Sequence, residues 1–319
     1  ALAAISDQAA DASTRQPRKP SADMARQIFL YDCREGVALI TFDRPERKNS
    51  WTSTIREEFY DAVDRAVFDS DCRVIVVTGV GRFWITGADV ETLAPGRSAP
   101  ASGERSPTTT LQGAAPDASA GWADSRGRRG NHLQTVPKPV IACVNGAAAG
   151  GGFAQMMSCD VRFAADDAVF TTAFARRGLI AEFGVSWTLP RAVGSGSALD
   201  LLLSARRLDA QEALRLGLVQ RVLPRAQLLE ATLEYARDIA QNVPPSSLAV
   251  IKQQVLRHAA LPAAEALHES DALMRISLRQ PEVREGARSF LERRAPRHAA
   301  YDAAHPLVRA AEELRSSKL

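Results

Sequence analysis

The segment Asn145–Met157 could do chemistry although it has almost no reactive side chains. It reads N-G-A-A-A-G-G-G-F-A-Q-M-M, with three consecutive glycines and no charged residue. The apolar run at 139–144 predicts a buried strand, and a helix over about 151–159 is expected to begin within the glycines. The start of a helix leaves backbone N–H groups unpaired and carries partial positive charge, and glycine lets another molecule approach that backbone. The segment therefore predicts a site for an anion or for a developing oxyanion.

Two familiar glycine motifs do not account for this segment. A phosphate-binding P-loop needs Lys and then Ser or Thr where Gly152 and Phe153 stand. A dinucleotide fingerprint needs a third glycine where the chain has Gln155. A structural role stays open, because the glycines could simply let a helix pack tightly on a strand.

A second segment has the same organisation. The apolar run at 73–79 predicts another buried strand, and G-R-F-W-I-T-G-A-D-V follows it at 81–90. Two such turns on one core could direct two backbone N–H groups at one oxygen atom. That arrangement is an oxyanion hole.

The elements that must position these turns follow from the hydrophobic pattern. Runs at 27–32, 36–42, 160–164 and 168–171 predict further strands, and 52–68 predicts an amphipathic helix that begins at a Ser or Thr cap. After residue 194 the pattern predicts helices at 195–204, 209–216, 224–242, 245–260, 262–277 and 281–293. An α/β core followed by a helical C-terminal region is therefore expected.

The chain divides into four parts on this pattern. We expect a disordered N-terminal tail at 1–26, a core at 27–223, a helical C-terminal region at 224–300 and, at 301–319, a polar tail that could be helical. Within the core, residues 94–121 are rich in Pro, Ser, Gly, Ala and Thr and predict a long exposed loop.

Composition argues against several classes of protein. The chain has 40 Lys and Arg against 37 Asp and Glu, and no dense basic stripe, so no nucleic-acid partner is expected. The four cysteines form no C-x-x-C pair and the five histidines no H-E-x-x-H motif, so no metal site is expected. The first residues lack a signal-peptide pattern, and the glycines and Pro139 within 139–157 argue against a membrane span. We therefore expect a soluble cytoplasmic protein.

Taken together, six ordered segments resemble the enoyl-CoA hydratase/isomerase (crotonase) superfamily, over about residues 27–300. The segments are D-R-P-E-R-K-N-S (43–50), G-R-F-W-I-T-G-A-D-V (81–90), K-P-V-I-A-C-V-N-G-A-A-A-G-G-G (138–152), C-D-V-R-F-A (159–164), L-D-A-Q-E-A-L-R-L-G-L-V (208–219) and E-G-A-R-S-F-L-E-R-R-A-P (285–296). The resemblance implies a crotonase-like spiral of ββα turns with a helical C-terminal trimerisation region. It also implies an acyl-CoA thioester substrate and a homotrimer or a dimer of trimers. Coenzyme A would enter as part of the substrate, with no separate cofactor.

The resemblance also implies which residues form the site. The thioester oxygen would accept hydrogen bonds from the N–H groups of Ala88 and Gly151 as it becomes an enolate oxygen. The basic side chains of Arg44, Arg47 and Lys48 could meet the phosphates of CoA, although surface Arg and Lys are more often only solvated. The residues expected to contact the CoA part are Arg47, Lys48, Asn49, Ile85, Thr86 and Ala88.

The chain departs from the hydratases of the superfamily at both of their glutamate positions. It has Ala154 and Phe174 there, and neither side chain can transfer a proton. Glu182 is the expected replacement, because relatives such as dienoyl-CoA isomerases and a haloaromatic-CoA dehalogenase place a carboxylate at about this position. Its apolar neighbours would raise its pKa. The alternative is a structural glutamate that caps a helix or pairs with an arginine at 176, 177 or 191.

These observations predict an acyl-CoA enzyme of the enoyl-CoA hydratase/isomerase type, with Glu182 as acid or base. Within that class, hydration, double-bond isomerisation and hydrolysis stay open. Two alternatives lie outside it. One is a non-catalytic acyl-CoA-binding protein. The other is a serine hydrolase based on Ser186, although its G-x-S-x-G motif ends in Thr188 instead of glycine.

Overall fold

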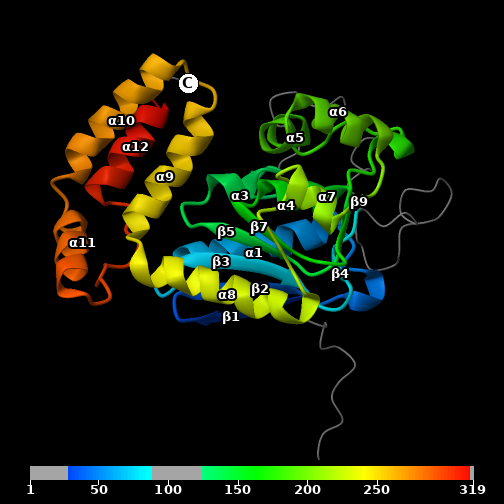
Figure 1. Ribbon diagram of the computed structural model, residues 1–319, viewed down its shortest axis with the longest axis horizontal. Helices are drawn as coiled ribbons and strands as arrows, with labels where there is room; N and C mark the ends of the chain where they lie inside the picture. Colours follow the sequence, from blue (N-terminus) through cyan, green and yellow to red (C-terminus); the bar gives the residue numbers. More distant parts are fainter. Residues whose placement is uncertain (1–27, 88–123, 317–319) are drawn as a thin grey trace, which may run out of the picture.

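The computed structural model describes residues 28–87 and 124–316. A layered α/β core lies beside a group of C-terminal helices that extends away from it (Figure 1). The predicted strands and helices within the described residues are confirmed, with bounds that agree to within two residues.

The larger sheet has six strands in the order β1-β2-β3-β5-β7-β10. Their bounds are β1 (Phe29–Arg34), β2 (Val37–Phe42), β3 (Val74–Gly79), β5 (Val140–Val144), β7 (Val161–Ala165) and β10 (Arg221–Leu223). All neighbouring strands are parallel except β1 and β2, which form an antiparallel hairpin. Every residue of β5 is buried, as expected for a parallel strand covered on both faces.

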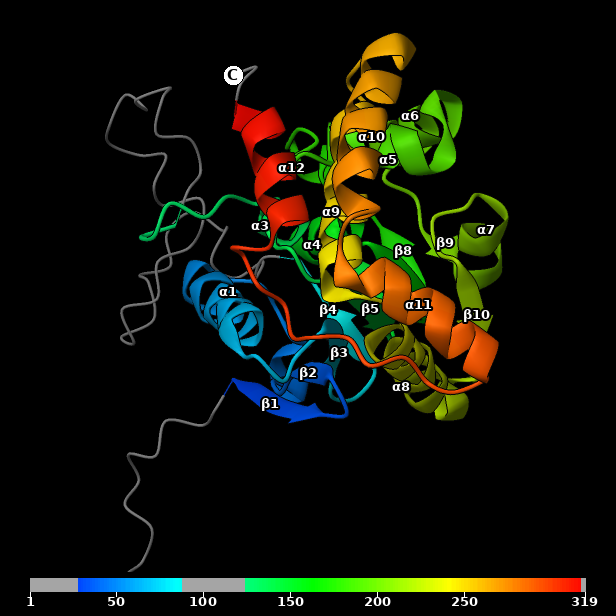
Figure 2. The same cartoon turned by 90° about the vertical axis from the view of Figure 1, so that its left-hand side faces the viewer.

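Helices cover both faces of this sheet. Helix α1 (Ser53–Phe68) packs on β1 and β2, whereas α8 (Arg225–Asn242) packs on β2, β3, β5 and β7 from the opposite side (Figure 2). The hydroxyl of Thr52 accepts a hydrogen bond from Ile55 N at 3.2 Å, which confirms the predicted cap of α1.

A smaller sheet lies beside the larger one and has the order β4-β6-β8-β9. Its strands are β4 (Phe83–Ile85), β6 (Ala147–Ala149), β8 (Val169–Thr171) and β9 (Leu208–Asp209). Each of β3, β5 and β7 in the larger sheet is followed along the chain by a short strand of the smaller one, and β6 leads directly into a helix. This repetition produces the ββα turns that the resemblance implies.

The remaining helices lie around the smaller sheet and in the C-terminal region. They are α3 (His132–Thr135), α4 (Gly151–Ser158), α5 (Val185–Val193), α6 (Ser195–Ser204), α7 (Ala210–Arg215), α9 (Pro245–His258), α10 (Ala263–Ser277), α11 (Pro281–Glu292) and α12 (Pro306–Ser316). Helix α12 lies within the segment expected to be a tail and packs against α9 and α10, around buried Leu307 and Val308.

Within 28–87 and 124–316, no helix combines the length and the apolar character needed to cross a membrane.

A buried lysine joins the helical region to the core. Lys252 on α9 contacts Asp160 Oδ2 at 2.8 Å and donates to Leu133 O at 2.7 Å and Lys138 O at 3.2 Å. Asp160 also accepts a hydrogen bond from Val140 N at 2.7 Å. One ammonium group therefore joins α9 to α3 and to the segments that lead into β5 and β7.

Replacing this lysine should destabilise the protein without disturbing the cavity described below. We expect Lys252→Met to lower the free energy of unfolding by about 3 kcal/mol, because it leaves the partly buried Asp160 carboxylate without its charged partner. Urea denaturation followed by circular dichroism measures the change. The double variant Lys252→Met/Asp160→Asn should recover part of the loss. Unchanged stability of Lys252→Met would contradict this role.

Candidate active site

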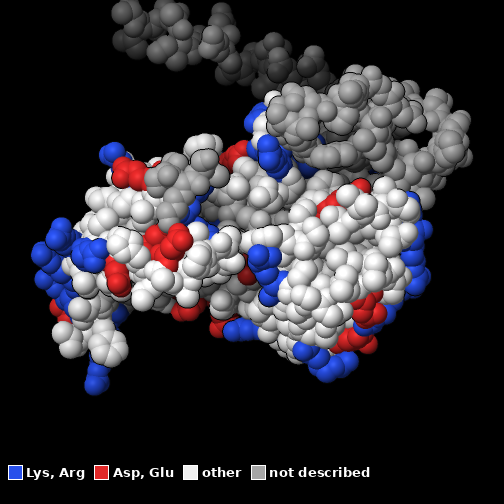
Figure 3. Space-filling model, turned by 90° about the horizontal axis from the view of Figure 1, so that it is seen from above, with Lys and Arg blue, Asp and Glu red and all other residues white. Residues whose placement is uncertain are grey.

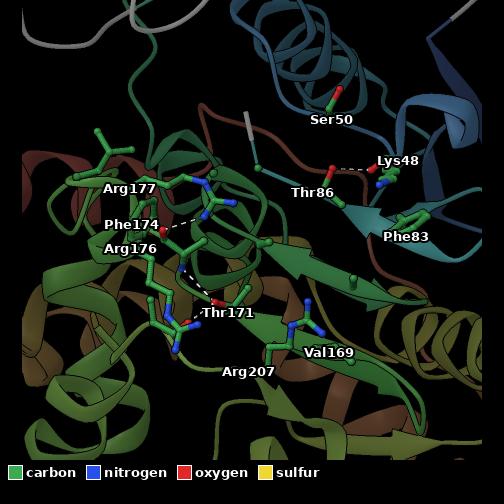
Figure 4. A pocket seen from close by; sticks show the side chains of 18 of the residues that line it. Lys48, Ser50, Phe83, Thr86, Val169, Thr171, Phe174, Arg176, Arg177 and Arg207 are labelled. Atoms are coloured by element: carbon green, nitrogen blue, oxygen red, sulfur yellow. Dashed lines mark hydrogen bonds between the residues drawn. The ribbon is translucent and has the colours of Figure 1, made fainter. Parts of the chain in front are cut away.

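A cavity of about 840 Å³ lies where the smaller sheet meets the first turn of α4. Strands β4, β6 and β8 form one side of its lining, together with residues of the loop at 46–50. Arg176 and Arg177 lie across the cavity from Lys48 and Thr86 (Figure 4). The cavity therefore gathers segments that lie far apart in the sequence.

The three consecutive glycines have three different roles. Gly150 has φ of 53°, a left-handed conformation that favours glycine. A Cβ atom on Gly152 would lie 2.0 Å from the carbonyl oxygen of Ile85, so only glycine allows α4 to approach β4 this closely. The structural alternative, tight packing of a helix on a strand, therefore explains why residue 152 is a glycine. This packing does not explain the glycine at 151.

Gly151 offers its backbone to the cavity. It is the first residue of α4 and forms part of the lining. Among the described residues, no acceptor pairs with its N–H group. A Cβ on Gly151 would lie 3.0 Å from Cδ1 of Trp51, so the indole supports this backbone from the side. Gly151 thus presents an unpaired donor at a helix N-terminus, beside open space.

The second predicted donor, Ala88, lies outside the described residues. The preceding residue, Gly87, lines the cavity, and a Cβ on Gly150 would lie only 3.3 Å from its Cα atom. The two glycine turns are therefore neighbours in the fold.

Glu182 lies in the lining of the same cavity. It stands in the turn before α5, where its carbonyl oxygen accepts a hydrogen bond from Val185 N at 3.0 Å. The side chain is partly buried, and burial raises the pKa of the carboxyl group above its ordinary value. A carboxyl group with a raised pKa is suited to proton transfer.

The arginines expected as alternative partners of Glu182 have other partners. Each donates to a main-chain carbonyl, and no ion pair to Glu182 occurs within the part of the chain that the structure describes. The three bonds are Arg176 Nε to Ser204 O at 2.8 Å, Arg177 Nη1 to Ala173 O at 3.0 Å and Arg191 Nη1 to Trp187 O at 3.0 Å. The first residue before α5 is Gly184, so Glu182 is not its side-chain cap either.

The two positions at which the hydratases have glutamates are apolar here and well packed. Ala154 lies on α4 and is 1% exposed. Phe174 is 3% exposed and forms part of the cavity lining. Glu182 and Glu46 are the carboxylate residues among the described lining residues, and Glu46 belongs to the loop on the other side.

The residues expected to contact CoA fall into two groups. Arg47, Lys48 and Thr86 line the cavity, and the hydroxyl of Thr86 donates to Lys48 O at 2.9 Å. Asn49 and Ile85 are buried outside the lining. The Asn49 amide donates to Phe83 O at 2.8 Å and Trp84 O at 3.1 Å, and thus holds the loop against β4. Arg44 is also outside the lining.

Positive charge predominates around the cavity. Its described lining contains the basic residues Arg47, Lys48, Arg176, Arg177 and Arg207 and the acidic residues Glu46 and Glu182. Arg207 could not be recognised from the sequence, because a basic residue beside another arginine carries no signal of its own. A cavity with this balance of charge suits a ligand with several negative charges.

Ser186 does not lie in this cavity. No histidine within the described ranges hydrogen-bonds to it, so the serine-hydrolase alternative lacks a base. His132, the histidine nearest the glycine turns in sequence, contacts Asp64 Oδ1 at 2.7 Å through Nε2 instead.

The raised pKa of Glu182 can be tested through protein stability. The native state binds more protons than the unfolded chain between the ordinary pKa and the raised one, so the free energy of unfolding falls as pH rises through this window. Glu182→Gln should therefore gain stability relative to the wild type as pH rises above the ordinary pKa of a glutamate, because the variant has no carboxyl group to deprotonate. Urea denaturation at several pH values measures the difference, and equal m-values show that both proteins unfold alike. A difference that does not change with pH would contradict the raised pKa.

Known proteins resemble this chain in sequence and in fold. The enoyl-CoA hydratase/isomerase family profile matches residues 32–300. A probable enoyl-CoA hydratase from Rhodobacter capsulatus is 34% identical over 278 residues, which cover 86% of this chain and 98% of the relative. The 1,2-epoxyphenylacetyl-CoA isomerase of Escherichia coli is 30% identical over 270 residues, which cover 85% of this chain and 97% of the relative.

Solved structures of enoyl-CoA hydratases and isomerases also resemble this chain. A probable enoyl-CoA hydratase/isomerase from Mycobacterium abscessus has a TM-score of 0.72 at 30% identity and covers 86% of this chain and 99% of its own. An enoyl-CoA hydratase from Mycobacterium marinum has a TM-score of 0.57 at 43% identity, with coverage of 72% and 96%. The α/β fold with its many C-terminal helices is thus the crotonase-like fold, and the chain belongs to the enoyl-CoA hydratase/isomerase (crotonase) superfamily.

Proposed function

We propose that this acyl-CoA enzyme of the hydratase/isomerase type stabilises a thioester enolate and moves one proton with Glu182. The observation that carries the proposal is the combination of two groups in one cavity. The Gly151 N–H has no acceptor among the described residues, and the Glu182 carboxylate has no cationic partner there.

The backbone donors would act on the thioester oxygen. Removal of a proton from the carbon next to the thioester places negative charge on that oxygen, and donors already in position stabilise the charge without reorganisation. Gly151 N–H is one donor, and Ala88 N–H is the proposed second. The position of Gly87 beside Gly150 supports this pairing.

Glu182 would carry the proton. Its carboxylate takes a proton from one carbon of the acyl chain, and the C–H electron pair moves into the enolate. The same carboxyl group then returns the proton to another carbon as the double bond shifts. One acid–base group is enough for this isomerisation. Hydration by two glutamates would need carboxylates at the positions of Ala154 and Phe174, whose side chains cannot transfer a proton. We therefore favour double-bond isomerisation over hydration.

The cationic lining would hold the CoA part. Arg47 and Lys48 lie on the same side of the cavity as Thr86, which fixes the Lys48 main chain through its hydroxyl. Phosphates attract such side chains strongly. CoA would thus be bound as part of the substrate.

Removal of the proposed acid–base group should abolish turnover but not binding. We expect Glu182→Gln to lower kcat by about 100-fold or more, because general acid–base catalysis contributes that much. A panel of acyl-CoA esters of varied length and unsaturation, followed by mass spectrometry and NMR, detects shifted double bonds, added water or released CoA. Calorimetric titration with butyryl-CoA is the control and should give the wild-type Kd. Wild-type binding without any turnover would instead favour a non-catalytic acyl-CoA-binding protein.

Assembly with further copies of the chain belongs to the same proposal. Large apolar side chains stand exposed on α9, α10 and α11, and on α6 of the core. They are Ile251, Val255, Leu267, Met274, Phe290, Leu291, Leu199 and Leu203. Figure 3 shows that much of the described surface seen from above is neither acidic nor basic. Monomeric proteins rarely expose so many large apolar groups, so we infer a homotrimer or a dimer of trimers.

Sedimentation tests this assembly. Analytical ultracentrifugation of the full chain should give three or six times its mass of 34.4 kDa. Phe290→Asp and Leu291→Asp on α11 should shift the distribution toward smaller species, because a charge is costly to bury in an apolar interface. Sedimentation of the wild type as a monomer at micromolar concentration would contradict the inference.

A further inference from the structure

A buried glutamine lies one turn after the proposed oxyanion donor on α4. Gln155 is fully buried, in a helix where every residue is buried. Its Oε1 accepts a hydrogen bond from the Tyr60 hydroxyl at 3.2 Å, and its Nε2 donates to Gly130 O at 3.2 Å. A buried amide is stable only when its polar atoms are paired, so the position of Gly130 is tied to α4.

Gly130 is pressed against the ring of Phe183. A Cβ atom on Gly130 would lie 2.6 Å from Cδ1 of Phe183 and 3.0 Å from its Cβ. Real side chains do not approach this closely, so any other residue at 130 would displace the phenylalanine. The contact joins two segments that are more than fifty residues apart in the sequence.

Phe183 directly follows Glu182 and has an unusual backbone conformation. Its φ is 53°, and Gly184 after it has φ of 76°. A phenylalanine in the left-handed region is strained and persists only where its surroundings hold it. The Phe183 side chain packs against the main core and lies directly against Gly130.

The loop that carries Gly130 cannot easily move away. Arg128 contacts Asp124 Oδ2 at 2.7 Å and Asp64 Oδ2 at 2.8 Å, and it donates to Glu57 O at 3.1 Å. Asp64 and Glu57 belong to α1. This loop is therefore fixed to α1 by charged hydrogen bonds and to α4 by Gln155.

We propose that Gln155, Gly130 and Phe183 form a clasp that positions the Glu182 carboxylate relative to the Gly151 N–H. They are positioning residues, and the role rests on the proposed function of Glu182. No side chain within the described ranges hydrogen-bonds to the Glu182 carboxylate, so its place depends on its own backbone turn. Helix α4 would thus carry the oxyanion donor in its first turn and set the place of the acid–base group from its second.

The variant Gly130→Ala tests the clasp, because the added methyl group must displace the Phe183 ring. The probe is butyryl-CoA in D2O, with mass spectrometry following exchange of its α-protons. We expect the saturated exchange rate to fall about tenfold or more and its pH midpoint to shift, while the Kd of butyryl-CoA stays within about twofold. The matched control is Gly196→Ala on α6, where a Cβ meets no atom within 4 Å, and it should behave as the wild type.

A second variant separates positioning from damage to the fold. Phe183→Ala in the Gly130→Ala background removes the ring atoms that the added methyl group would meet, and it should restore part of the exchange rate. Gln155→Leu should also slow exchange, with little change in Kd, because Gly130 loses its bond to α4. Exchange at the wild-type rate in both Gly130→Ala and Gln155→Leu would overturn the clasp. Weaker binding of butyryl-CoA without a slower saturated exchange rate would overturn it as well.

Crystal structures distinguish failure of the clasp from failure of the proposed function. In Gly130→Ala we expect the distance from Glu182 Cδ to Gly151 N to change by about 1 Å or more, the scale of displacement that matters for catalysis. An unchanged distance overturns the clasp even if Glu182→Gln is inactive. A changed distance, with Glu182→Gln fully active, supports the clasp and overturns the role of Glu182.

Discussion

The close approach of α4 to β4 is the constraint on which the site depends. Gly152 lies so near the Ile85 carbonyl that a side chain there would stand 2.0 Å from the oxygen. This contact fixes where α4 begins, and Gly150 turns the chain into the helix with φ of 53°. Because the helix begins there, Gly151 lines the cavity, and its N–H has no acceptor among the described residues.

The site is recognisable by the polar groups that have no hydrogen-bond or charge partner among the described residues. Polar groups around it are used within the protein, such as the Asn49 amide on two carbonyls of β4 and the Arg177 guanidinium on Ala173 O. Gly151 N–H and the Glu182 carboxylate have no such partner among the described residues, and burial alone raises the pKa of Glu182. Unpaired buried groups of this kind lower the stability of the folded protein, and groups with a shifted pKa cluster at functional sites.

The sequence predicted the long elements and the glycine turns, because hydrophobic periodicity and glycine are local signals. It did not predict β4, β6 and β9, which are only two or three residues long and are defined by pairing with distant segments. Helix α5 was missed as well, since Pro190 interrupts its pattern. The burial of Asn49 and the contact of Gly130 with Phe183 could not be predicted, because both depend on packing between distant segments. The role of Ala88, outside the described residues, stays a prediction.

The most direct test of the account is a crystal structure of the wild-type protein with butyryl-CoA. We predict that the thioester oxygen lies between about 2.7 and 3.1 Å from Gly151 N, the range expected for a donor of an oxyanion hole. The acyl chain should then extend toward Glu182. A thioester bound elsewhere, with the Gly151 N–H paired to an acceptor of the protein, would contradict the account.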